Sequence, residues 1–222
     1  MKNSADDKEK ISALITECNS MNIAVSRPNI NMSEIDFNPY VPIIKDQAIQ
    51  TDEEKIDKIS EIDAYKNYEG NKPISYGLGT IKSISSNAIL PIVEEREKNG
   101  EFKNIEDFIT RMSENPISKG SLEALIKVGA FDDIEKREIL LPSVEKIAME
   151  MSRRNKLEAS GQANMFDLFG DEVKVPLNLN LIETEVDYKE RMFWERDLLG
   201  TVLSENPINK KIETYSNSHI VL

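Results

Sequence analysis

The middle of the chain carries one pattern twice, a turn of small residues followed by a helix with an apolar face. The first copy lies in residues 79–96 (GTIKSISSNAILPIVEER) and the second in residues 115–131 (NPISKGSLEALIKVGAF). Ser85 or Ser86 is expected to cap the first helix, because a serine oxygen accepts hydrogen bonds from the free amides of a first turn. Helices joined by tight turns form helical hairpins. The pattern therefore predicts a mainly α fold built on two hairpins.

The turn of each hairpin is a candidate anion site. Backbone amides at a helix N-terminus are free to donate, and the helix dipole favours negative charge there. Lys82 beside the first turn and Lys119 beside the second add positive charge, which suits a phosphate held without reading a base. The first turn has Ser83 and Ser85 where strong phosphate-binding hairpins have glycine, and serine tolerates positive φ less well. This predicts a weaker grip, and a plain hairpin in the core of an α domain is the alternative interpretation.

The charge of the chain is unusual for a protein that binds nucleic acid. The formal net charge is −12, and a negative protein is disfavoured near a phosphate backbone. Residues 72–156, which hold both hairpins, carry 14 Lys/Arg and 14 Asp/Glu, whereas residues 1–71 and 157–222 are each six charges negative. Any contact with phosphate is therefore expected in the middle third.

Rare residue types exclude several classes of site. Cys18 is the only cysteine and His219 the only histidine. The chain therefore cannot form an internal disulfide, a zinc site built on several Cys or His, or a Ser-His pair in a packed site. No metal or cofactor is expected, although carboxylates distant in sequence leave an enzyme site open as a rival. No run of eighteen apolar residues is present to span a membrane, and a reducing cytoplasm is the expected compartment.

Helical spacing predicts further helices around the hairpins, at residues 5–21, 104–112, 134–159 and 187–203. Residues 45–69 are polar and acidic, which indicates a surface helix or an insertion. Asn104 and Asp107 resemble a capping box, and Pro91 is expected to distort the early turns of the first hairpin's helix. The expected core residues are Ile11, Leu14, Ile15 and Cys18 on the first helix and Phe193, Leu198 and Leu199 on the last.

Residues 161–170 (GQANMFDLFG) form an apolar peptide within a segment that otherwise reads as a linker. A short peptide docks onto a partner by inserting apolar side chains while a polar residue fixes the register. Gln162 is suited to fix the register, and Met165 and Phe166 are suited to insert. The alternative is that Phe166 and Phe169 fold back onto their own domain as a latch, and the residues alone leave both interpretations open.

The order of five segments is highly specific: ISYGLGTIKSISSNAILPIVEERE, FKNIEDFITRM, SKGSLEALIKVGAFD, GQANMFDLFG and ERDLLGTVLSENPI. In this order the chain resembles bacterial replicative DNA polymerase III alpha subunits over nearly its whole length, apart from the acidic insertion. The resemblance implies a tandem helix-hairpin-helix module that contacts the backbone of the primer–template duplex. It also implies a linker peptide that binds the ring-shaped sliding clamp, with the form glutamine, two variable residues, Leu or Met, then Phe.

Carried over by position, the resemblance implies two sets of contacts. The contacts to the DNA backbone would come from Gly79, Lys82, Ser83, Ser85, Ser86, Asn87, Lys119 and Gly120. The contacts to the clamp would come from Gln162, Met165, Phe166, Leu168 and Phe169. The implied partners are duplex DNA, the sliding clamp and the rest of the polymerase holoenzyme.

The resemblance also divides the chain into five parts. These are a post-fingers segment (1–44), the acidic insertion (45–71), the tandem helix-hairpin-helix module (72–159), the linker with the clamp peptide (160–186) and a helix leading to an OB-fold (187–222). The family's palm, with its metal-binding aspartates, has no counterpart here, so this section is expected to be inactive as a polymerase by itself. A structural or protein-interaction helical module that has lost DNA binding is the alternative.

Overall fold

The computed structural model describes residues 5–39, 73–159, 181 and 183–204. Their longer helices are α1 (Ala5–Ser20), α3 (Ser86–Asn99), α4 (Ile105–Arg111), α5 (Lys119–Lys127), α7 (Val144–Ala159) and α9 (Tyr188–Leu199). The shorter elements are α6 (Arg137–Leu140), the 3₁₀ turns η3 (Leu78–Thr80) and η4 (Leu141–Ser143), and the strands β1 (Val25–Ser26), β2 (Asn38–Pro39) and β3 (Ile74–Ser75). The prediction of a mainly α fold is confirmed.

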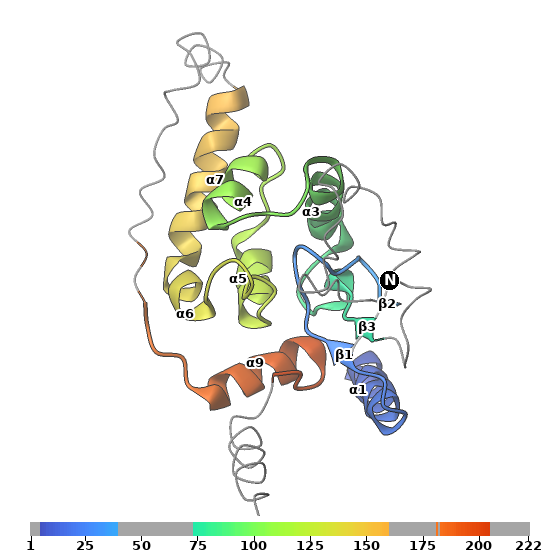
Figure 1. The fold of residues 1–222 in the computed structure, drawn as a ribbon. Coiled ribbons are helices and arrows are strands. Elements are labelled where there is room, and N and C mark those ends of the chain that lie inside the picture. The colour runs from blue at the N-terminus through green and yellow to red at the C-terminus, as the bar shows by residue number, and fades with distance from the viewer. Residues whose placement is uncertain (1–4, 40–72, 160–180, 182, 205–222) are drawn as a thin grey trace, which may run out of the picture.

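The helices lie in two groups that α9 joins (Figure 1). In one group α7 packs along α4 and α5, which form the second hairpin. The other group contains α3, the three short strands and α1. Helix α9 contacts α5 and extends toward the strands, so it reaches both hairpins.

The short strands hold the N-terminal segment against the first hairpin. Strand β3 is central, with β1 parallel to it and β2 antiparallel on its other side. Beyond β3, the amides of Leu78 and Gly79 donate to the carbonyls of Glu34 and Ile35, each at 2.8 Å. Residues 33–36 therefore line the start of the first hairpin.

The predicted N-caps are found where local sequence places them. Ser85 is the N-cap of α3, and Gly100, with a φ of 80°, ends that helix. The Asn104 side chain accepts from the amide of Asp107 at 2.8 Å, which confirms a side-chain cap at the start of α4. Pro91 lies inside α3 and does not end it.

The predicted helix over residues 134–159 is wrong in its first part. The chain forms α6, then η4, and only then α7. Pro142 lies in η4, and proline has no amide to donate within a helix. The apolar spacing of the segment continued through the proline, whereas the backbone hydrogen bonds of an α-helix did not.

Two of the predicted core residues are wrong. Leu14 on α1 is 59% exposed and Phe193 on α9 is 69% exposed, whereas Ile15, Leu198 and Leu199 are buried. Residues five apart on a helix point about 140° away from each other. Phe193 therefore cannot share the buried face of α9 with Leu198.

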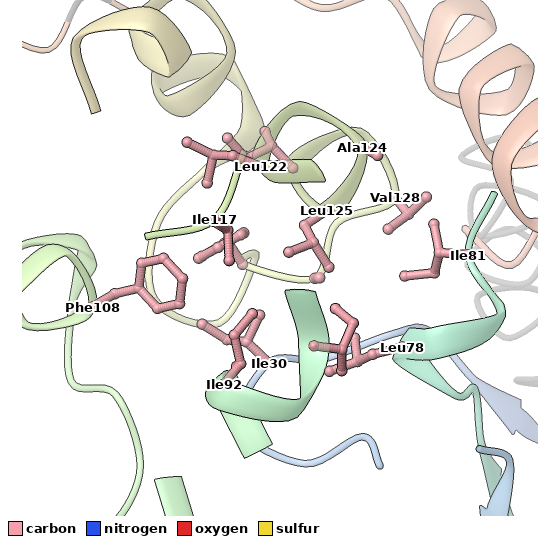
Figure 2. Packing of buried hydrophobic residues seen from close by; sticks show 14 of the residues in the cluster. Ile30, Leu78, Ile81, Ile92, Phe108, Ile117, Leu122, Ala124, Leu125 and Val128 are labelled. Carbon is pink, nitrogen blue, oxygen red and sulfur yellow. The ribbon is translucent and has the colours of Figure 1, made fainter. Parts of the chain in front are cut away.

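One hydrophobic core joins the two hairpins. Figure 2 shows Leu78, Ile81 and Ile92 from the first hairpin and Ile117, Leu122 and Leu125 from the second gathered around a common interior. Ile30 from the N-terminal segment belongs to the same core, as do Ile15 of α1 and Leu199 of α9. The described residues of the predicted parts 1–44, 72–159 and 187–222 thus share one core.

Candidate nucleic-acid interface

The first hairpin consists of η3, the turn at residues 81–85 and α3. Its chain reverses at Ser83, whose φ of 70° lies in the left-handed region. The amide of Ile84 donates to the carbonyl of Ile81 at 3.3 Å across this turn. A non-glycine residue pays on the order of 1 kcal/mol for this conformation. The turn therefore keeps its shape without glycine, at some cost in stability.

The N-terminus of α3 is open to solvent. Ser85 is the N-cap, but its hydroxyl makes no capping hydrogen bond. Ser85, Ser86 and Asn87 are all exposed. The first amides of a helix have no acceptor within that helix. The start of α3 therefore presents N–H donors, together with the positive end of the helix dipole, to an anion from outside.

Lys82 lies within this turn rather than beside it, and it contacts α9. Its amide donates to the carbonyl of Leu198 at 3.0 Å. Its ammonium lies 2.7 Å from the Asp197 carboxylate, and the two side chains are 49% and 47% exposed. The positive charge nearest the turn is thus paired with a carboxylate of another helix.

Gly79 has a packing role. Its amide donates to the carbonyl of Ile35 at 2.8 Å. A Cβ at this position would lie 2.8 Å from the Ile35 side chain. The amide therefore already has an acceptor within the protein, and the expected contact of Gly79 with DNA stays a prediction.

The second hairpin consists of α4, residues 112–118 and α5. Lys119 and Gly120 are the first two residues of α5 and directly follow the turn. The Ser118 hydroxyl oxygen accepts from the amide of Ser121 at 3.1 Å, so this helix start is capped by its own side chain. The Lys119 ammonium lies 3.4 Å from the Glu145 carboxylate, and both side chains are more than half exposed.

Helices α3 and α5 share a feature that sets them apart from α4, α6, α7 and α9. Neither has an acidic residue in its first turn. The first turns of the other four contain Glu106 and Asp107, Glu138, Glu145 and Glu190, respectively. A carboxylate in the first turn complements the positive end of the helix dipole. The second helix of each hairpin therefore leaves that end available to an external anion.

A buried ion pair that sequence reasoning missed joins the second hairpin to α9. Arg137 is 2% exposed and Glu195 is fully buried, and Nη1 of Arg137 lies 3.2 Å from Oε1 of Glu195. The same nitrogen donates to the carbonyl of Lys127 at the end of α5 at 3.0 Å. Glu195 also accepts from the amides of Leu203 and Ser204, at 2.9 and 2.8 Å. The pair therefore fastens α9 to the second hairpin.

The Arg137 guanidinium is held in its charged form. Burial works against the charge, but the hydrogen bonds and charges of Asp132 and Glu195 outweigh it and raise the pKa of Arg137 above its ordinary value. The available sequence signal was Glu195 itself, an acidic residue on the same helix face as Leu198 and Leu199. An ionised residue in such a position requires a buried partner.

Part of the predicted site lies outside the described residues. This holds for the whole clamp peptide, including Gln162, Met165, Phe166, Leu168 and Phe169, and for the acidic segment 45–69. Within the described ranges, no cluster of three or more His, Cys, Asp or Glu is placed to hold a metal ion. In the same ranges no helix has both the length and the apolar character needed to cross a membrane.

The chain is similar to known proteins across both hairpins. A family model described as "Helix-hairpin-helix motif" matches residues 22–140. The DNA polymerase III subunit alpha of Chlamydia pneumoniae is 33% identical over 221 residues, which are 98% of this chain and 15% of that protein. The subunit of Deinococcus radiodurans is 29% identical over 92% of this chain and 13% of its own length. That of Borreliella burgdorferi is 27% identical over 99% and 17%. The chain thus spans well under a fifth of these relatives.

Proposed function

We propose that this chain, which belongs to the helix-hairpin-helix family and corresponds to a C-terminal section of bacterial DNA polymerase III alpha subunits, binds the backbone of duplex DNA. The binding would take place during replication. The observation that carries this proposal is the open N-terminus of α3. It is uncapped and exposed, and it lacks an acidic residue in its first turn. The same helix end follows a tight turn in a hairpin, which is the geometry that holds a phosphate.

The proposed contact uses backbone donors. The amides of Ser86 and Asn87 would donate to phosphate oxygens, and the dipole of α3 would favour the negative charge. The start of α5, with Lys119, would contact a second phosphate in the same manner. Contacts of this kind position a protein on the duplex without reading its sequence.

The negative charge of the whole chain is consistent with a local and weak contact. Residues 72–156 are neutral overall, so the binding relies on two helix ends and a few cations. Each phosphate neutralised contributes about −0.9 to the slope of log K against log salt. Two to four contacts would therefore give a slope of about −2 to −3.5.

A charge placed at the α3 N-cap tests this proposal. Aspartate caps a helix at least as well as serine, so Ser85→Asp is expected to keep α3 folded. It would also put a carboxylate where the phosphate binds. We expect a loss of affinity of about tenfold for a labelled mixed-sequence duplex at low salt, measured by fluorescence anisotropy.

The matched control is Asn104→Asp at the N-cap of α4. It adds the same charge to a helix start that already has Glu106 and Asp107 in its first turn. Its effect on DNA affinity is expected to be small. If the wild-type chain does not bind duplex even at low salt, the alternative of a helical protein-interaction module replaces this proposal. Equal losses for the two variants would remove α3 from the interface.

We further propose that QANMF, residues 162–166, binds the sliding clamp and that the chain works with the rest of the polymerase holoenzyme in the bacterial cytoplasm. The support is the pattern of the peptide, with Gln162 followed by Met165 and Phe166. A tether raises the effective concentration of the polymerase at DNA, so a weak peptide contact is sufficient.

The clamp proposal is tested by calorimetry with purified clamp. The double variant Gln162→Ala/Phe166→Ala is expected to abolish measurable binding, because it removes the anchor and one inserted ring. Asn164→Ala changes a variable position of the same peptide and is expected to bind as the wild type does. Unchanged affinity in the double variant would reject this assignment.

A further inference from the structure

The C-terminal end of α9 lies directly beside the turn of the first hairpin. Two contacts from Lys82 in the turn reach α9: its amide donates to the Leu198 carbonyl at 3.0 Å, and its ammonium pairs with Asp197. Tyr76, two residues before η3, adds a third, because its hydroxyl donates to the Leu199 carbonyl at 2.9 Å. The last carbonyls of a helix have no donors within that helix. Lys82 and Tyr76 supply donors to two of these carbonyls.

This arrangement brings negative charge to the candidate phosphate site. A helix C-terminus carries the equivalent of about half a negative charge, and Asp197 in the last turn adds a full one. The carboxylate lies 2.7 Å from Nζ of Lys82. Because both side chains are about half exposed, a phosphate in solution can approach the same ammonium.

Asp197 is held in place independently of its pairing with Lys82. Two neighbours on α9, Leu198 and Leu199, are buried in the core. Glu195, one half-turn earlier, is fixed by the buried pair with Arg137. The carboxylate is therefore a permanent neighbour of the turn, since α9 is anchored by groups that do not face the DNA site.

We propose that Asp197 competes with DNA phosphates for Lys82 and thereby lowers both the affinity and the salt dependence of the first hairpin. This inference rests on the proposed binding of duplex DNA. Each ammonium that neutralises a phosphate releases counterions condensed on the DNA, so an ammonium that stays paired with a carboxylate adds little to the salt slope. Asp197 is thus an affinity-determining residue that itself contacts no DNA.

The experiment uses the full chain and a fluorescent mixed-sequence duplex, titrated between about 50 and 200 mM salt. Asp197→Asn keeps the shape of the side chain and removes its charge. We expect it to bind about two- to fivefold more tightly at the lowest salt. We also expect its salt slope to be steeper by about 0.9, the value for one additional phosphate contact.

The matched control is Glu190→Gln, which removes the same charge from the first turn of the same helix. It is expected to leave the salt slope unchanged and to raise affinity less. A second test repeats Asp197→Asn in a Lys82→Gln background, where the gain beyond the control is expected to vanish. Circular dichroism and thermal unfolding confirm that each variant is folded.

The outcomes separate this inference from the proposed function. If the wild type binds and Asp197→Asn is no tighter than Glu190→Gln, Asp197 does not compete and only the present inference is overturned. An equal gain in the Lys82→Gln background has the same consequence. Binding by Asp197→Asn but not by the wild type supports the competition for Lys82 and overturns DNA binding by the wild-type chain. Binding by no variant at any salt overturns both.

Discussion

The two hairpins start their second helices differently. The N-cap of α5 is Ser118, whose hydroxyl oxygen accepts from the Ser121 amide. The N-cap of α3 is Ser85, whose hydroxyl makes no such bond, after a turn that holds Ser83 at positive φ. A helix end capped from within is stabilised by its own chain, whereas an uncapped end retains donors for an outside group. The start of α5 is thus stabilised by its own side chain, whereas the start of α3 is the more available to a phosphate.

Helix α9 is also attached differently to the two hairpins. At the second hairpin the attachment is the buried pair of Arg137 and Glu195. At the first it is the exposed pair of Lys82 and Asp197, together with the Tyr76 hydroxyl. Breaking a buried pair leaves a charge without water or partner, whereas an exposed charge is rehydrated. Each difference between the hairpins predicts a measurable asymmetry.

The largest asymmetry is expected between the two ion pairs. Arg137→Met leaves Glu195 buried without its cation and is expected to lower the free energy of unfolding by about 3–5 kcal/mol. Lys82→Met breaks an exposed pair and is expected to cost less than about 1 kcal/mol. Urea unfolding followed by circular dichroism measures both. Similar losses for the two variants would mean that burial does not determine how much the Arg137–Glu195 pair contributes to the free energy of unfolding.

High pH is expected to weaken the attachment at the first hairpin alone. Burial, opposed by a hydrogen bond with Thr80, raises the pKa of Tyr76 to about 12 from its ordinary 10.0. The contribution of this phenol to the free energy of unfolding is therefore complete below pH 10. It is lost as the pH rises to 12, because the phenol ionises at lower pH in the unfolded chain than in the folded one. Arg137 at the second hairpin keeps its charge, since its pKa is raised.

Tyr76→Phe isolates this effect. At pH 7 the variant is expected to lose about 1 kcal/mol of stability with the hydrogen bond to Leu199. Between pH 10 and pH 12 the wild type is expected to lose about 2 kcal/mol more than the variant, with about half of that by pH 11. Urea unfolding of both proteins at pH 8, 10 and 11 gives the difference. A gap that stays constant with pH would show that the phenol titrates normally.

The caps are expected to differ by a smaller amount. Ser118→Ala removes a cap that is made and should cost about 1 kcal/mol, whereas Ser85→Ala removes a hydroxyl that caps nothing and should cost only a few tenths. Both are read from the shift in the urea midpoint. The reverse order would mean that α3, not α5, depends on its N-cap side chain.

The smallest effect is expected at the strained turn. Ser83→Gly relieves the positive φ and should stabilise the chain by about 0.5 kcal/mol, after the entropy that glycine loses on folding. Ser83→Ala keeps the Cβ and should give no gain. Thermal unfolding distinguishes them, and a gain shared by both variants would point away from backbone strain.

Much of the helical framework could be predicted because its signals are local. An N-cap involves residues three apart in the chain, so Asn104 and Asp107 indicate the start of α4 in the sequence itself. Gly100 announces the end of α3 in the same way. The break at Pro142 was also local, but a continuing apolar spacing concealed it. Periodicity reports burial rather than hydrogen bonding.

The candidate site was predicted only in part. The position of Lys82 at the turn follows from the chain, but its pairing with Asp197, 115 residues away, does not. Gly79 was expected to contact DNA because of its place in the motif, yet its amide donates to the carbonyl of Ile35. Phe193 was expected in the core because it is a large apolar residue on a predicted helix. Helical spacing does not show which face of that helix meets its neighbours.

The order of short motifs was thus sufficient to predict the family, the two hairpins and the helix ends, since each of these depends on residues close together in the chain. The tertiary structure decided which helix end remains open, which charges are buried and where α9 touches the first hairpin. Those features depend on pairs such as Arg137 with Glu195, 58 residues apart. Such pairs meet only when the shared core brings their helices together, and no local pattern encodes that meeting.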